Sequence, residues 1–116
     1  MSGAQEPVSA RPGAGGKSLQ RVGSLAVLRS AGAFAATVAG RRVAVFSVGD
    51  DVVATQGRCP HAKGPIHEGA VLGETLTCPW HGYTFNLRTG ACEDDPDLIL
   101  ERYDVRIDGD DILVSI

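Results

Sequence analysis

The sequence contains little cysteine and no long hydrophobic run. Three of its 116 residues are cysteine, an odd number far below the density of secreted scaffolds held by disulfides. No apolar stretch approaches the roughly 20 residues that span a bilayer. The first 20 residues also lack the apolar core of a secretory signal. We therefore expect a cytoplasmic protein without a membrane anchor, in which at least one thiol is unpaired.

Aromatic residues are also few, six in all, and no stripe of basic residues with interleaved aromatics occurs. Nucleic acid is therefore not an expected partner. The net charge of −3 hides a split, because residues 1–49 hold six basic and one acidic side chain, whereas residues 50–116 hold five basic and thirteen acidic ones. The densest acidic run, residues 93–97, is either a solvated loop or a docking surface for a basic partner.

The length and the spacing of apolar runs predict one all-β domain. Residues 1–17 are rich in Gly, Ala, Pro and Ser without periodicity, which predicts a flexible tail before a domain at 18–116. Residues 98–100 are compatible with a helical turn, but no window keeps a helical period, so we expect little helix. Short apolar runs separated by turn residues predict an antiparallel sandwich or small barrel; the runs are 22–28, 34–38, 41–48, 52–56, 75–78, 83–87, 101–107 and 111–116.

Two short motifs carry the chemistry. The first is Cys59-Pro60-His61 and the second is Cys78-Pro79-Trp80-His81, which gives the spacing C-x-H, sixteen residues, C-x-x-H. Each motif offers one thiolate and one imidazole, and the Pro and Gly residues around them favour turns over helices. Such turns can also direct backbone N–H groups toward a sulfur atom. The pattern predicts a metal site built from two loops.

Several explanations of these four residues compete. A zinc site is chemically possible and would make the chain a zinc-stabilised interaction module, but finger-type zinc sites usually pair Cys with Cys and His with His along the chain. A catalytic Cys-His dyad would leave the second pair without a purpose. Unrelated loop residues would not explain two matched pairs. An iron–sulfur centre in which two His replace two Cys on one iron accounts for the interleaved order.

On these motifs the sequence resembles the Rieske family. The resemblance extends to the flanking stretches Gly64-Pro65-Ile66, Glu68-Gly69 and Thr89-Gly90. It implies a Rieske-like antiparallel β base with a cluster-binding subdomain at about 57–90, and a third loop near the cluster at 93–98. It also implies one Rieske-type 2Fe-2S cluster, with Cys59 and Cys78 on one iron and His61 and His81 on the other.

Stand-alone Rieske ferredoxins are the members that the chain resembles. The resemblance implies an electron carrier, not an enzyme, that takes single electrons from a flavin-containing reductase to a terminal oxygenase such as a ring-hydroxylating dioxygenase. The alternative is the small Rieske-like subunit of a cytoplasmic nitrite reductase, bound to its large subunit. We expect no catalytic residue in either case.

Departures from the high-potential Rieske proteins predict the redox behaviour. Those proteins carry one extra Cys in each cluster loop, joined by a disulfide, whereas Gly64 and Trp80 stand at the matching positions here. We expect Trp80 to shield the cluster by its bulk instead. Tyr83 and Phe85 replace a Ser and a Tyr whose hydroxyl groups bond to sulfur, and losing such bonds lowers the potential. We therefore predict a reduction potential of about −150 mV, at the low end of the Rieske range.

Two further candidate ligands fall outside the motif spacing. His67 lies six residues beyond His61 and is expected to be a histidine of a surface loop. Cys92 is expected to be a small packed residue and not a ligand.

Overall fold

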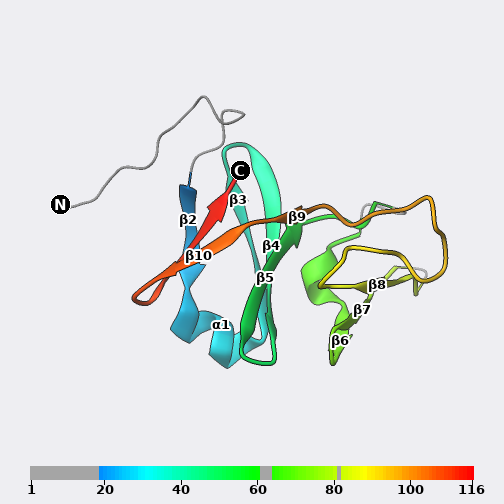
Figure 1. Cartoon of the computed structure of the whole chain (residues 1–116), viewed down its shortest axis with the longest axis horizontal. Helices are drawn as coiled ribbons and strands as arrows, with labels where there is room; N and C mark the ends of the chain where they lie inside the picture. Colours follow the sequence, from blue (N-terminus) through cyan, green and yellow to red (C-terminus); the bar gives the residue numbers. More distant parts are fainter. Residues whose placement is uncertain (1–18, 61–63, 81) are drawn as a thin grey trace.

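Three antiparallel sheets make up the computed structural model, which describes residues 19–60, 64–80 and 82–116 (Figure 1). The strand order is β10-β11-β2 in the first sheet, β3-β4-β5-β9 in the second and β6-β7-β8 in the third. The predicted all-β antiparallel fold is confirmed. The strands are β2 (Leu19–Ser24), β3 (Ala33–Val38), β4 (Arg41–Val48), β5 (Asp51–Gln56), β6 (Ala70–Leu72), β7 (Thr75–Thr77), β8 (Thr84–Asn86), β9 (Arg102–Tyr103), β10 (Val105–Asp108) and β11 (Asp111–Ser115).

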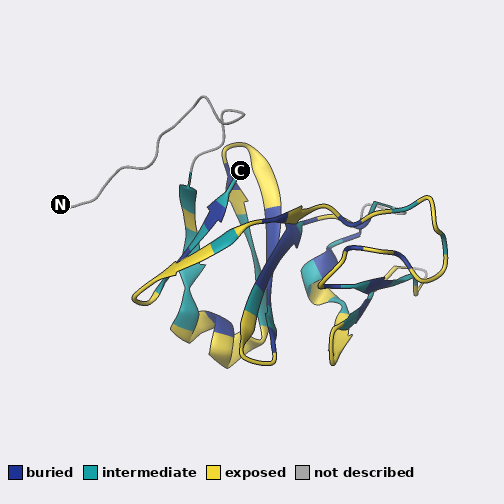
Figure 2. Ribbon diagram, viewed as in Figure 1, coloured by how far each residue is buried: buried dark blue, intermediate teal, exposed yellow. Residues whose placement is uncertain are grey.

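Strand β4 lies at the centre and is buried on both faces (Figure 2). Its near-continuous apolar sequence is typical of a strand covered on both sides. Val43 and Val45 pack toward β2, β11 and α1, the helix at Leu25–Ala31. Ala44 and Phe46 pack on the opposite side, against the segments that carry the cysteines. The middle sheet therefore has a core on each side and positions the loops that hold the site.

The run predicted as a strand at 22–28 is only partly a strand, because the chain turns into helix α1 at Leu25. Ser24 caps this helix, since its hydroxyl accepts a hydrogen bond from the Val27 N–H at 3.1 Å. Gly32, at φ 85°, ends the helix through an N–H bond to the Leu28 carbonyl at 2.7 Å. The helix buries Leu28, so the apolar residues of this run serve a helix face.

Other differences from the predicted elements lie in short segments. Strand β6 was not predicted, and all three of its residues are exposed. The run at 101–107 divides at Asp104 into β9 and β10. The helical turn considered at 98–100 is wrong, because Ile99 forms an isolated antiparallel bridge with Ala91.

The tail predicted at 1–17 lies outside the described residues, and the domain boundaries remain a prediction. Across the part of the chain that the structure describes, no helix has the length and apolar character needed to cross a membrane.

Candidate metal centre

The first loop of the site follows β5 and is closed by backbone hydrogen bonds. The N–H of Cys59 donates to the carbonyl of Gly64 at 2.9 Å, and the N–H of Ile66 donates to the carbonyl of Gly57 at 3.1 Å. Arg58 and Pro65 form an antiparallel bridge across the same loop. A short 3-10 helix, η2 (Ile66–Glu68), then leads into β6. These bonds fix both ends of the loop, so the Cys59 side chain has a defined position.

The second loop joins β7 to β8. Cys78 comes directly after β7, and its N–H donates to the carbonyl of Tyr83 at 2.7 Å. Gly82 within the loop has a φ of 73°, in the left-handed region that favours glycine. The two short strands pair in register, which places the loop at the end of a small hairpin.

The two loops bring Cys59 and Cys78 together. Both side chains are buried, each at 1% exposure, and they belong to the same hydrophobic core. The two thiols are hydrogen-bond partners, and burial together with this neighbour raises the pKa of Cys78 to about 11, against a lowering effect of the Trp80 N–H. The pair is free of disulfides. Two adjacent buried thiols fit one metal ion, because a bound cation removes the protons that burial otherwise retains.

The predicted histidine ligands, His61 and His81, lie outside the described residues. Among residues 19–60, 64–80 and 82–116, no three His, Cys, Asp or Glu side chains are close enough to hold a metal ion. The structure thus brings together the two predicted cysteines, and the full set of four ligands stays a prediction.

His67 and Cys92, the two candidate ligands outside the motif spacing, lie in different environments. The Nδ1 atom of His67 is buried and has no hydrogen-bond partner, while its Nε2 lies 3.8 Å from the carboxylate of Glu68. Cys92 is a buried member of the core that contains Cys59 and Cys78, and it pairs with Phe85 in an isolated bridge. Cys92 is therefore a packed residue, as the sequence suggested.

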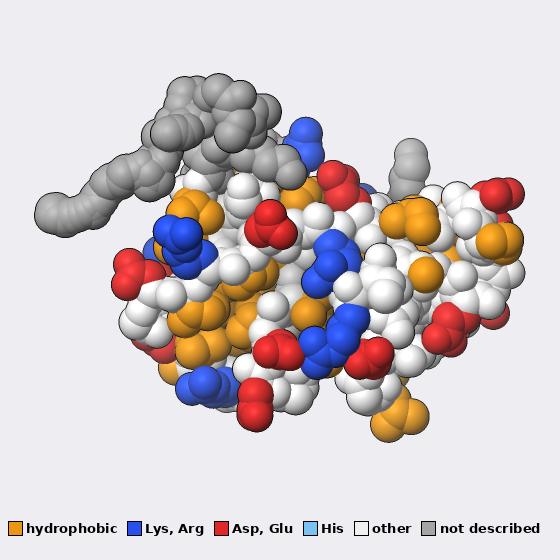
Figure 3. Space-filling model, viewed as in Figure 1, with side chains coloured by type: hydrophobic (Ala, Val, Ile, Leu, Met, Phe, Trp, Pro, Cys, Tyr) orange, Lys and Arg blue, Asp and Glu red, His pale blue; other side chains and the backbone are white. Residues whose placement is uncertain are grey.

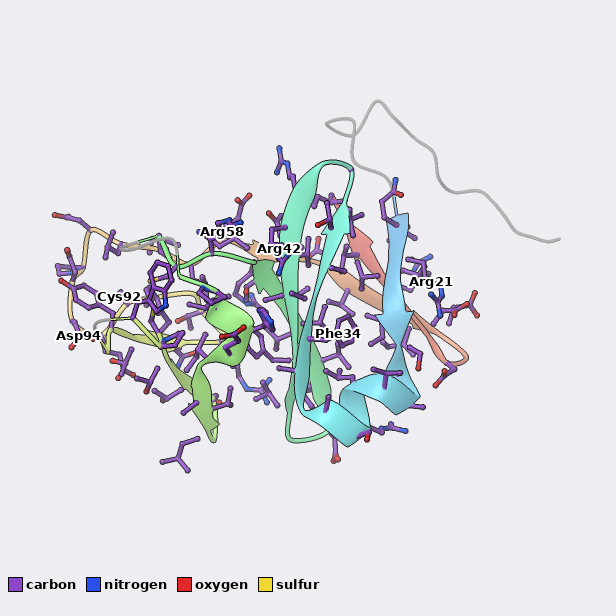
Figure 4. The ribbon with its side chains drawn as sticks, turned by 180° about the vertical axis from the view of Figure 1, so that it is seen from behind. Arg21, Phe34, Arg42, Arg58, Cys92 and Asp94 are labelled. Atoms are coloured by element: carbon purple, nitrogen blue, oxygen red, sulfur yellow. The ribbon has the colours of Figure 1, made fainter. Side chains whose placement is uncertain are left out.

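The predicted third loop, at 93–98, is fastened to β8. The carboxylate of Asp94 accepts hydrogen bonds from the N–H of Thr84 at 2.7 Å and from its hydroxyl at 3.0 Å. Figure 4 shows Asp94 and Cys92 at the same end of the molecule. The acidic run is thus held against the strand that follows the second loop.

Tyr83 and Phe85 stand where the sequence comparison expects a Ser and a Tyr with hydroxyl groups that bond to sulfur. Phe85 is fully buried, and Tyr83 is partly buried against the core that contains the cysteines. Phe85 offers no hydroxyl group to a sulfur atom. One hydrogen-bond donor of the site was not identified from the sequence. The backbone N–H of Trp80 is directed to the sulfur of Cys78. The turn-forming residues predicted such groups in general but could not say which residue supplies one.

Comparison with known proteins gives a consistent picture. The family model of the Rieske [2Fe-2S] domain matches residues 18–104. The biphenyl dioxygenase ferredoxin subunit of Pseudomonas sp. (strain KKS102) is 37% identical over 77 residues, which are 65% of this chain and 71% of that protein.

Two solved structures have a similar fold. The ferredoxin of carbazole 1,9a-dioxygenase from Nocardioides aromaticivorans IC177 matches with a TM-score of 0.75 and 35% identity, over 83% of this chain and 95% of that chain. A chain from a complex of reduced oxygenase and oxidized ferredoxin in carbazole 1,9a-dioxygenase matches with a TM-score of 0.75 and 25% identity, over 84% of this chain and 92% of that chain.

Proposed function

The chain belongs to the Rieske [2Fe-2S] domain family, and on this premise we propose that it is a ferredoxin that passes single electrons from a flavin-containing reductase to a terminal oxygenase. Relatives that are ferredoxin components of dioxygenases support the proposal, as does the similar chain from a complex of an oxygenase with a ferredoxin. The proposed site of action is the cytoplasm. The chain carries no substrate chemistry of its own in this proposal.

The observation that carries the proposal is the buried pair of thiols, Cys59 and Cys78. The family has one Rieske-type 2Fe-2S cluster, which gains and releases one electron when bound. In this proposal Cys59 and Cys78 hold one iron, and His61 and His81 hold the other. The packed side chains around the thiols exclude water, and Phe85 supplies no hydroxyl bond to sulfur. These features favour a potential of about −150 mV.

Charge supports a basic electron-transfer partner. Figure 3 shows acidic side chains at the end of the molecule that carries β6, β7 and β8, and the run at 93–97 is anchored to β8 through Asp94. Acidic groups on a docking surface steer a basic partner at low ionic strength. Reduction by a reductase that docks there should slow as salt is added, and rates that are equal at low and high salt would remove this steering.

Stepwise electron transfer tests the function directly. The purified protein is reduced with dithionite without oxygen, its low-temperature EPR spectrum is recorded, and it is then mixed with the oxygenase of carbazole 1,9a-dioxygenase as acceptor. We expect a rhombic signal with an average g below the free-electron value and the transfer of one electron per molecule. Colourless protein with stoichiometric zinc and no EPR signal would contradict the proposal. Isolation with a large haem-containing chain would favour the nitrite reductase alternative.

A further inference from the structure

The two loops of the site touch each other through Gly64 of the first loop and Trp80 of the second. A Cβ atom built on Gly64 would lie 2.9 Å from both Cγ and Cδ2 of the Trp80 ring and 3.3 Å from its Cβ. The indole therefore rests directly on the backbone of Gly64, and a Cβ atom at this position would force the ring or the loop to shift. Gly64 is buried, whereas Trp80 as a whole remains 50% exposed.

The same two residues contact both cysteines, one through its backbone and one through its thiol. The carbonyl of Gly64 accepts the N–H of Cys59 at 2.9 Å, and the N–H of Trp80 is directed to the sulfur of Cys78. A closed chain of contacts thus runs from Cys59 through Gly64 and Trp80 to Cys78, whose thiol meets that of Cys59. The contact between the indole and Gly64 thus links the two loop segments that carry Cys59 and Cys78.

We propose that Gly64 and Trp80 form a noncovalent staple between the two loops, which holds Cys59 and Cys78 at the separation that the cluster requires and slows its loss. The inference rests on the proposed function, since it assumes that these cysteines hold the cluster. Trp80 acts as a positioning residue through its ring and its N–H. Because the staple contains no sulfur, millimolar thiol reductants should leave the rate of cluster loss unchanged.

A double-mutant cycle tests the staple. Trp80→Ala removes the ring but keeps the N–H, and Gly64→Ala places a methyl group where the base of the ring lies. Each single variant should lose visible absorbance about tenfold faster than the wild type in the presence of an iron chelator, which corresponds to about 1.4 kcal/mol. The double variant should lose it no faster than Trp80→Ala, because the new methyl group no longer meets a ring.

Two further variants separate the staple from a general effect on the fold. Trp80→Phe keeps an aromatic ring on Gly64 and should retain most of the slow cluster loss. Leu72→Ala removes another exposed apolar side chain, 85% exposed on β6, and should behave as the wild type. Wild-type cluster loss in Trp80→Ala, or effects of Trp80→Ala and Gly64→Ala that add in full, would overturn the proposal.

A second readout needs no cluster, because Trp80 is the single tryptophan of the chain. In cluster-free protein, acrylamide should quench the fluorescence of Trp80 more strongly in Gly64→Ala than in the wild type, since the methyl group displaces the indole into water. Equal quenching would contradict the contact. If no variant or wild type ever binds a cluster, the proposed function fails, while the fluorescence result still decides whether the indole rests on Gly64.

Discussion

The two faces of β4 support cores of different character. On one face lies the β2–β11 core, which contains no cysteine: Leu28, Val38, Val43, Val45, Ala54, Tyr103, Ile112 and Val114. On the other lies the ligand-loop core, which contains all three cysteines: Ala44, Phe46, Val48, Val53, Cys59, Ile66, Leu76, Cys78, Phe85, Leu87, Cys92 and Leu100. Alternate residues of one strand thus serve a purely structural core and a core that surrounds the site.

The difference shows what each half needs in order to fold. The β2–β11 core is enclosed by long ladders, such as the six residue pairs between β3 and β4. Opposite β4 and β5, the ligand-loop core is enclosed by strands of three residues and by turns. Strands that short are marginal on their own, and metal binding supplies folding free energy where a site is incomplete without it. We therefore expect the cluster to make opening of the ligand-loop core rarer, while the closed form still predominates without the cluster, and the β2–β11 core to be independent of it.

The largest effect should come from Cys78→Ser, which removes one of the paired thiols. We expect no cluster to be bound, because a serine hydroxyl at this buried position is a poor ligand for iron. Amide hydrogen exchange should then accelerate across β7, β8 and the loop between them, while β3 and β4 remain protected. Exchange measured by mass spectrometry on peptides from each region reports both outcomes.

Cys92→Ser is the matched control, because Cys92 lies in the same core but outside the motif. It should keep the cluster, with a modest loss of stability from a buried hydroxyl. If Cys92→Ser abolished the cluster while Cys78→Ser retained it, the assignment of the ligands would be wrong. If the amides of both cores lost protection from exchange together in Cys78→Ser, the β2–β11 core would not be independent of the cluster.

A smaller but clear effect is expected from cavities on the two faces of β4. Phe46→Ala opens the ligand-loop core and should lower the free energy of unfolding by about 3–5 kcal/mol. Val45→Ala opens the β2–β11 core and should cost about 1.5–2 kcal/mol, from the loss of two carbon atoms. Denaturant titration of both variants measures these values.

Cluster retention distinguishes the two faces further. Only Phe46→Ala should release the cluster faster than the wild type, because Phe46 belongs to the same core as Cys59 and Cys78. Equal release from both variants, measured by the decay of visible absorbance, would show that the two cores are not independent.

The sequence predicted the centre of the fold better than its margins. The bounds of β4 were predicted correctly because a strand buried on both faces is a continuous apolar run between turn residues. Helix α1 was missed because the apolar run at 25–28 fits either element, and the helix is selected by the hydrogen bonds that its first turn makes to Ser24 and to the distant Asp110. Strand β6 was not predicted because its three residues are all exposed, so its sequence shows no alternation of apolar and polar residues.

The sequence likewise predicted one part of the site and not the other. The spacing of the motifs identified Cys59 and Cys78, which the fold brings together. Spacing could not reveal that the indole of Trp80 rests on Gly64, because that contact depends on how the two loops approach each other. Sequence patterns report local chemistry, whereas a contact between loops is set by the packing of the whole core.

The smallest effect is expected where a side chain joins the two halves of the molecule. The guanidinium of Arg88 bonds to Asp51, at the start of β5, at 2.8 Å and to Glu74, in the turn between β6 and β7, at 2.9 Å. All three side chains are largely exposed, and exposed ion pairs stabilise little. Arg88→Met should therefore lower Tm slightly at low salt, with the difference from wild type shrinking as salt is added.

The pH dependence of that difference identifies Glu74 as one of its sources. Hydrogen bonds from Asn86 and Arg88 hold the pKa of Glu74 below its usual 4.5. A lowered carboxylate pKa stabilises the fold above the usual value, and this stabilisation is lost as pH falls through the lowered pKa. The Tm difference between wild type and Arg88→Met should thus be constant between about pH 5 and pH 7 and shrink below pH 4.5. A Tm difference that changes with neither salt nor pH would mean that Arg88 stabilises the fold through packing of its aliphatic stem and not through its charge.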